Sequence, residues 1–310
     1  MKVFVTGATG YIGREVVAAL HRAGHEPVGL ARDPSRTAAL ASLPVRWVVG
    51  DLRDPAGWVD AAAGCDAAVH AGAEVGPGAA SVDAAALDGL LEAASRPGGP
   101  ETVVYTSGVW VLGARPDVPA DESVALDPAA LVAWRPAHER RVLDADSREL
   151  TGCVVRPGIV FGGRGGLIAP LFEKTLSDGA PTVVGDGRNR WPLVHLSDLA
   201  DLYRRLVEER PILLSLPRSE RVFHAVGGDA EPAAEVALAA ALAAGGSGEV
   251  RLWPLEAARA SLGPFADALA LDQLVAAPRS EALLGWRPRY RGFVRNAPEA
   301  LAQWGRPEGP

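Results

Sequence analysis

The first thirteen residues constrain the fold of this chain more than any other stretch. Residues 2–6 are mostly apolar β-formers and predict a short buried strand. Three spaced glycines, Gly7, Gly10 and Gly13, follow at once, and a helical pattern begins directly after them. In a strand–turn–helix unit, such glycines permit an unusual backbone conformation, a close approach to a phosphate and tight helix–strand packing. Because a helix N-terminus also presents free N–H groups, the stretch predicts a pyrophosphate-binding loop.

A charged segment follows the second expected strand, which spans residues 27–31. Arg32, Asp33 and Arg36 lie about 20 residues beyond the glycine loop, where a dinucleotide's ribose is recognised. An acid there suits a free 2′-hydroxyl group, whereas an arginine suits a 2′-phosphate. Arg32 and Arg36 therefore favour NADP(H) over NAD(H), with Asp33 pointing the other way. The alternative is that Arg32 is an ordinary solvated loop charge.

Strands alternate with helices as far as residue 157. Further strands are expected at 45–49, 66–70, 102–106 and 153–156, with helices at 79–94 and 129–149 among them. Pro136 should either kink the last helix or mark its true start. This alternation predicts an α/β fold, a Rossmann-like doubly wound parallel sheet with a smaller C-terminal substrate lobe. We assign residues 1–160 to a dinucleotide-binding domain, to which 183–226 return, and 161–182 and 227–310 to the substrate-binding lobe.

Composition excludes several classes of protein. The 310 residues are 48% hydrophobic with a net charge of −7, and no basic stripe predicts a nucleic-acid partner. No apolar run reaches the length of a membrane span, and no His/Cys/Asp cluster has metal-ligand spacing, so neither membrane nor metal is expected. The two cysteines are expected to be buried thiols. Since the first strand begins at residue 2, no secretory signal is expected and the predicted location is cytoplasmic.

Five short motifs give the chain a family resemblance. They are Thr6–Gly13, Gly50–Leu52, Thr106–Ser107, Arg156–Gly162 and Val194–Ala200. With them the chain resembles the extended short-chain dehydrogenase/reductase family, also described as NAD-dependent epimerases/dehydratases. The resemblance covers nearly the whole length.

This resemblance implies roles for individual residues. It places Ser107 beside the reacting oxygen of the substrate, and it implies a small-molecule substrate and a possible homodimer through the helix at 129–149. The implied cofactor residues are Gly7, Thr9, Gly10, Tyr11, Ile12 and Gly13 at the pyrophosphate, Asp51 and Leu52 at the adenine, Ala71 and Ala73 along the groove, and Pro157 and Val160 near the nicotinamide. The implied substrate contacts are Arg190, Trp191 and His195. Val109 and Trp110 are further substrate candidates; Trp110, Trp134 and Trp191 either form an aromatic wall for an apolar substrate or are separate core residues.

One departure from the family is as informative as the match. The family carries a Tyr-x-x-x-Lys motif that supplies the proton and holds the nicotinamide ribose, and this chain has none. Trp134 and His138 stand at the corresponding positions. An indole N–H does not titrate, whereas an imidazole titrates near neutrality. The catalytic candidates are therefore Ser107 as a hydrogen-bond donor to a carbonyl oxygen, His138 and Trp134. Tyr105 is either a substitute proton donor or a packed strand residue.

These residues favour one function over two alternatives. The favoured function is an NADP(H)-dependent oxidoreductase of atypical acid/base chemistry, acting on a small apolar biosynthetic intermediate. The second is a non-redox isomerase, dehydratase or cyclase on the same scaffold. The third is a non-catalytic NADP-binding sensor.

Overall fold

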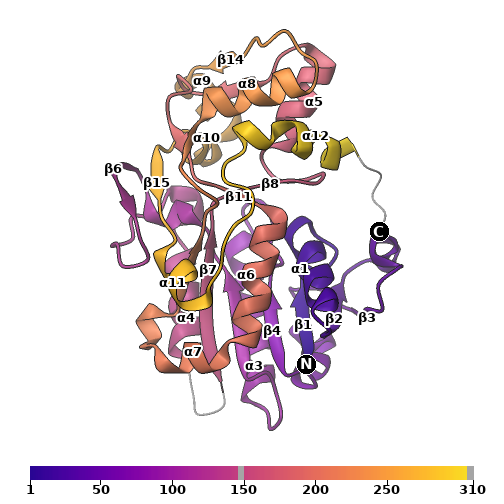
Figure 1. Ribbon diagram of the computed structural model, residues 1–310. Helices are drawn as coiled ribbons and strands as arrows, with labels where there is room; N and C mark the ends of the chain where they lie inside the picture. The colour runs from indigo at the N-terminus through magenta and orange to yellow at the C-terminus, as the bar shows by residue number, and fades with distance from the viewer. Residues whose placement is uncertain (146–149, 306–310) are drawn as a thin grey trace.

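A seven-stranded parallel sheet forms the centre of the computed structural model, which describes residues 1–145 and 150–305 (Figure 1). Its strand order is β12-β7-β5-β4-β1-β2-β3, and each neighbouring pair is parallel. The strands are β1 (Lys2–Thr6), β2 (Glu26–Ala31), β3 (Arg46–Val49), β4 (Ala67–His70), β5 (Thr102–Thr106), β7 (Thr151–Pro157) and β12 (Val222–Ala225). The predicted Rossmann-like fold is confirmed.

Both faces of this sheet are covered by helices. Val3 and Val5 of β1 face one hydrophobic cluster, and Phe4 between them faces another, as alternation along a strand requires. All three side chains are fully buried, which explains why β1 is continuously apolar. The first face carries α1 (Tyr11–Arg22) and α6 (Leu196–Glu208), and the second carries α2 (Val59–Ala63), α3 (Ala79–Ser95) and α4 (Arg135–Asp144).

A smaller body lies beyond the carboxyl ends of the central strands, at the top of Figure 1. Its helices α5 (Ala169–Asp178), α8 (Ala233–Ala243) and α12 (Ala297–Gly305) enclose a separate hydrophobic cluster. Four two-stranded pairs surround it or lead to it. They are β8 (Ile159–Phe161) with β11 (Leu193–His195), β9 (Thr182–Val184) with β14 (Arg251–Trp253), β10 (Arg190–Trp191) with β13 (Glu231–Pro232), and β6 (Arg115–Ala120) with β15 (Gln273–Val275).

The segment 183–226 divides its contacts between the two bodies. β12 pairs with β7 of the large sheet and α6 packs against α1, whereas β9 and β10 pair with β14 and β13. The proposed domain boundaries stay a prediction. The remaining helices are α7 (Arg210–Ser215), α9 (Leu255–Leu262), α10 (Pro264–Leu269) and α11 (Pro278–Leu284). Within the described residues, no helix has the length and apolar character needed to cross a membrane.

The helix expected at 129–149 begins later than expected. A short 3-10 turn, η4 (Ala130–Val132), precedes α4, which starts at Arg135. Pro136 occupies the first turn of α4, where its missing N–H group costs no hydrogen bond. Residues 146–149 lie outside the described part of the chain. The homodimer expected through this helix stays a prediction.

Candidate functional site

A cleft of about 310 Å³ opens where β1 meets α1. It lies at the carboxyl end of a parallel sheet, the place where doubly wound folds bind their ligands. Most of the predicted cofactor residues line it. The lining residues are Gly7, Thr9, Gly10, Tyr11, Ile12, Leu30, Arg32, Asp33, Arg36, Gly50, Asp51, Leu52, Ala71, Gly72, Ala73 and Glu74.

The glycine loop fits a dinucleotide because its backbone is packed closely. Side chains at Gly7 and Gly13 would clash with neighbouring backbone atoms. Gly7 has φ of +66°, and a Cβ atom there would lie 2.5 Å from Gly72 Cα. A Cβ atom at Gly13 would lie 2.1 Å from the Gly7 carbonyl oxygen. Gly10 precedes α1 and has no side chain to cap it, so the first turn of that helix keeps N–H groups for an anion.

The ribose end of the cleft carries three charged side chains with different surroundings. Asp33 Oδ1 accepts a hydrogen bond from the Ser35 backbone N–H at 2.9 Å and caps a 3-10 helix, η1 (Pro34–Leu40). Hydrogen bonding from the Ser35 side chain and from this backbone N–H holds the pKa of Asp33 below its ordinary value. Arg32 lies 3.8 Å from Glu74, and its side chain is 59% exposed. Arg36 also lines the cleft. Asp33 is thus engaged with its own loop, while both arginines are exposed to a ligand.

Three predicted cofactor residues do not line this cleft: Gly13, which lies in α1, and Pro157 and Val160. Pro157 ends β7, and Val160 lies in β8, where it pairs with Val194. The Pro157 carbonyl oxygen is 3.9 Å from the position that a Cβ atom would take on Gly108. Pro157 is therefore beside Gly108, at the carboxyl end of the sheet.

Ser107 follows β5 directly and is 7% exposed. Its backbone N–H donates to the Val155 carbonyl at 2.8 Å, which fixes the residue against β7. Its Oγ is buried and has no hydrogen-bond partner among the described residues. A buried hydroxyl group that is left unpaired carries a desolvation cost. The role of Ser107 as a donor to the oxygen of a substrate stays a prediction.

His138 lies on α4 and is held by a buried carboxylate that the sequence did not reveal. Its Nδ1 is 2.6 Å from Asp83 Oδ2, on α3. The same carboxylate accepts hydrogen bonds from Tyr105 at 2.9 Å and from His70 at 3.2 Å. Tyr105 is fully buried, and burial raises the pKa of its hydroxyl group. This favours the packed role of Tyr105 over the role of substitute proton donor.

Trp134 caps the N-terminus of α4, and its ring packs against two side chains of that helix. Its ring centroid lies 4.9 Å from that of His138, and the Arg135 guanidinium lies 4.6 Å from the ring. Arg135 in turn donates to the Thr106 carbonyl at 2.8 Å. Trp134 therefore restricts the imidazole of His138 and shields it without offering a titratable group.

The predicted substrate residues fall into two groups. Trp110 is half-buried and meets Phe265 edge-on at 6.1 Å, so it can form an apolar wall. Val109 is buried in the main core. The indole of Trp191 donates to the Leu269 carbonyl at 2.9 Å within the core of the smaller body.

The two charged members of that prediction already have protein partners. Arg190 donates to both Asp272 oxygens, at 2.8 and 2.7 Å, and to the Pro116 carbonyl at 2.6 Å. His195 is 5% exposed and lies within hydrogen-bond distance of Ser197 and Gln303. Burial lowers its pKa. As substrate contacts, both stay predictions.

Tyr11 joins the cofactor loop to the segment that follows β8. Its hydroxyl group donates to the Gly162 carbonyl at 2.6 Å. Its ring fills the space in which side chains at Gly165 and Gly166 would lie. Burial raises the pKa of this hydroxyl group, so Tyr11 stays protonated and anchors the two segments to each other.

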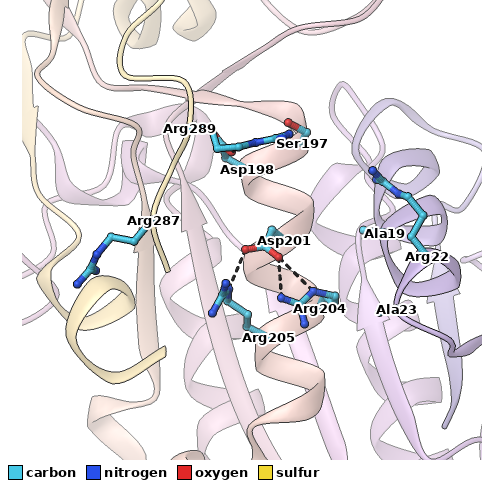
Figure 2. Close-up of a pocket in the computed structure, with 10 residues that line it drawn as sticks. All are labelled: Ala19, Arg22, Ala23, Ser197, Asp198, Asp201, Arg204, Arg205, Arg287 and Arg289. Carbon is cyan, nitrogen blue, oxygen red and sulfur yellow. Dashed lines mark hydrogen bonds and ion pairs between the residues drawn. The ribbon is translucent and has the colours of Figure 1, made fainter. Parts of the chain in front are cut away.

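A second cavity, of about 580 Å³, lies at the other end of α1 (Figure 2). Arginines from α1, α6 and the segment after α11 surround it, but Asp201 already accepts hydrogen bonds from Arg204 and Arg205, each at 2.7 Å. No group of three or more potential metal ligands is found within residues 1–145 and 150–305. The glycine-loop cleft, with Ser107 beyond it, is therefore the candidate active site.

These features define a doubly wound α/β protein with a dinucleotide cleft. The chain belongs to the NAD dependent epimerase/dehydratase family, whose sequence model matches residues 3–212. The predicted family is confirmed, and the chain is an NAD(P)-dependent enzyme of the epimerase, dehydratase or reductase kind.

Curated relatives cover different shares of the chain. An uncharacterized protein of Saccharomyces cerevisiae is 28% identical over 96% of this chain and 97% of its own. The 2-alkyl-3-oxoalkanoate reductase of Stenotrophomonas maltophilia is 29% identical over 64% of this chain and 63% of its own.

Solved structures share the fold at low identity. A dTDP-glucose 4,6-dehydratase of Bacillus anthracis in complex with NAD has a TM-score of 0.81 at 16% identity, covering 98% of this chain and 96% of that one. MoeE5 in complex with UDP-glucose and NAD has a TM-score of 0.76 at 21% identity, covering 98% and 99%.

Proposed function

We propose that this protein is an NADPH-dependent reductase of a small carbonyl compound with a large apolar part. The observation that carries the proposal is the buried, unpartnered Ser107 Oγ beyond the dinucleotide cleft. A bound dinucleotide supplies the hydride. Ser107 then donates a hydrogen bond toward the oxygen on which negative charge develops, and so stabilises the transition state.

The preference for NADPH rests on the ribose end of the cleft. Arg32 and Arg36 both line it, and the side-chain oxygen of Asp33 is engaged with Ser35. A guanidinium group binds a phosphate through charge-assisted hydrogen bonds. An acid that caps its own loop is less available to a free 2′-hydroxyl group. These contacts support NADP(H) as the cofactor.

The apolar character of the substrate rests on Trp110, three residues after Ser107, and on two arginines that already have protein partners. Trp110 and Phe265 offer aromatic surface, whereas Arg190 is neutralised by Asp272 and Arg135 is bound to a backbone carbonyl. An anionic diphosphate group would find the side chain of Arg190 already occupied. The similarity to a protein named 2-alkyl-3-oxoalkanoate reductase also favours carbonyl reduction.

Arg32→Ala should shift the cofactor preference toward NADH. Charged hydrogen bonds contribute about 1.5–3 kcal/mol, so NADPH affinity should fall roughly 10- to 150-fold while NADH affinity stays the same. Quenching of tryptophan fluorescence measures both affinities. Arg46→Ala, an exposed arginine on β3 that does not line the cleft, is the matched control. If neither dinucleotide binds the parent chain at concentrations of tens of micromolar, the redox function is contradicted.

Ser107→Ala should lower turnover without weakening cofactor binding. Loss of one such donor reduces kcat/KM about 100-fold. Oxidation of NADPH by a panel of aryl and long-chain alkyl ketones, followed by absorbance, gives the rate. Ser95→Ala, an exposed serine of α3, is the control. If NADPH binds tightly but no carbonyl compound is reduced, the non-redox enzyme or the sensor is favoured instead.

A further inference from the structure

Asp83 is the centre of a buried hydrogen-bond network that spans the dinucleotide-binding body. It lies on α3 and is 5% exposed. Its two oxygens receive hydrogen bonds from three side chains on three other elements: His70 of β4, Tyr105 of β5 and His138 of α4. A buried carboxylate is costly unless it is fully hydrogen-bonded, and here it is.

The hydrogen bonds of this network run in one direction toward Asp83. The Gly72 backbone N–H donates to Thr6 Oγ1 at 3.3 Å, so the Thr6 hydroxyl group is free to donate to His70 Nδ1 at 2.7 Å. With Nδ1 as acceptor, neutral His70 carries its proton on Nε2 and donates it to Asp83. The chain therefore begins beside the glycine loop and ends at the carboxylate.

The same reasoning fixes the state of His138. An ionised carboxylate only accepts hydrogen bonds, so the 2.6 Å contact requires a proton on His138 Nδ1. Burial alone would raise the pKa of Asp83, but the hydrogen bonds from His138 and His70 hold it below its ordinary value. In the neutral imidazole, the lone pair then lies on Nε2. No hydrogen bond to Nε2 is found in the described part of the chain.

We propose that Asp83 is a positioning residue that holds His138 in the Nδ1-protonated tautomer, so that Nε2 is the nitrogen that delivers the proton in the reduction. This inference rests on the proposed function. When hydride reaches the carbonyl carbon, the C=O π bond breaks and the oxygen becomes an alkoxide. Protonated His138 gives its Nε2 proton to that oxygen. Its Nδ1 keeps its own proton, which stays hydrogen-bonded to Asp83, and solvent then reprotonates Nε2.

The position of His138 explains how the chain can dispense with a tyrosine. His138 replaces the lysine of the usual motif, and Trp134, which replaces the tyrosine, packs 4.9 Å from the imidazole. The ring is thus restricted on one side by an indole and on the other by Asp83. The arrangement resembles the histidine–carboxylate pairs of other enzymes, in which the acid sets the tautomer.

The first test needs no cofactor and no substrate. Nitrogen NMR of the imidazole groups, with His138 assigned through His138→Gln, should show neutral His138 protonated on Nδ1. In Asp83→Asn the Nδ1-protonated form should be less populated, because a neutral amide oxygen accepts a hydrogen bond less strongly than a carboxylate does. The charged and titratable groups that face Asp83 are His70, Tyr105, His138 and Arg135.

Two controls separate this role from packing. Glu122→Gln removes another buried carboxylate, which accepts from the His224 backbone N–H and does not contact His138. Tyr105→Phe removes one donor to Asp83 but keeps the carboxylate. Both should leave the His138 tautomer unchanged. If Asp83→Asn does not fold, the NMR spectrum of the parent chain is still a test. A neutral His138 protonated on Nε2 in that spectrum overturns the inference.

The second test uses turnover of NADPH with the best ketone found. Asp83→Asn should lower kcat at least tenfold and shift the pH profile of kcat to lower pH, with the Kd for NADPH unchanged. An unchanged pH profile together with an unchanged tautomer overturns the role of Asp83. Failure of the parent chain to bind NADPH would instead contradict the proposed function, and the tautomer result would stand.

Discussion

Gly7→Ala should abolish NADPH binding. The new Cβ atom would lie 2.5 Å from Gly72 Cα, 2.6 Å from Gly72 N and 2.7 Å from the Ala71 carbonyl carbon. All three are backbone atoms, so no side chain can rotate away and the loop itself must move. A positive φ adds about 1–2 kcal/mol for any residue with a Cβ atom. We expect NADPH affinity to fall at least about 1,000-fold, which corresponds to about 4 kcal/mol.

Gly24→Ala is a matched control for this prediction. Gly24 also has a positive φ, of +82°, but a Cβ atom there would meet no atom within 4 Å. It should lower the melting temperature while leaving the Kd for NADPH unchanged. Fluorescence titration and thermal unfolding measure the two effects. If Gly7→Ala binds NADPH as tightly as Gly24→Ala, the loop does not carry the dinucleotide.

Glu139→Gln should cause the largest loss of stability among single substitutions near the site. Glu139 of α4 accepts two hydrogen bonds from Arg156 of β7, at 3.0 and 2.6 Å, and the two side chains are only 3% and 5% exposed. Removing one charge leaves the other buried without its counter-charge, which costs about 3–5 kcal/mol. The midpoint of urea unfolding should fall accordingly.

Glu92→Gln provides the comparison for this second substitution. Glu92 also pairs with an arginine, Arg96, at 2.7 Å, but both side chains are solvent-accessible. Water and salt screen such a pair, so the unfolding midpoint should not change. Because Glu139 follows His138 directly, Glu139→Gln should also reduce turnover in the folded protein. Equal stability of the two variants would contradict a structural role for the buried pair.

The sequence predicted the large sheet well because its strands are local and apolar. β1 contains three buried apolar residues and is followed by glycines with the spacing of a phosphate-binding loop. Both the strand and the loop could therefore be identified. The short strands β6, β14 and β15 could not. They have three to six residues each, too few for periodicity, and β14 finds its partner about 70 residues earlier and β15 its partner about 150 residues earlier in the chain.

The candidate site was predictable where it follows a motif and not where it depends on tertiary pairing. Gly7, Gly10 and Arg32 follow a motif and line the cleft. Asp83 gave no signal, because it is one of three acids in an alanine-rich helix and lies 55 residues from His138. The pairing of Arg190 with Asp272, 82 residues further along, gave no signal either, and the substrate contact of Arg190 stays a prediction.

The hydrogen bond from Tyr11 to Gly162 has a consequence for protein engineering. Tyr11 begins α1 and lines the glycine-loop cleft, and its ring is enclosed by the glycine segment at 162–166, where the chain enters the smaller body. A chimera that exchanges the smaller body to change specificity must therefore keep residues 162–166 together with Tyr11. A junction placed after residue 166 and before α5 preserves this contact, whereas a junction before β8 breaks it and exposes the ring.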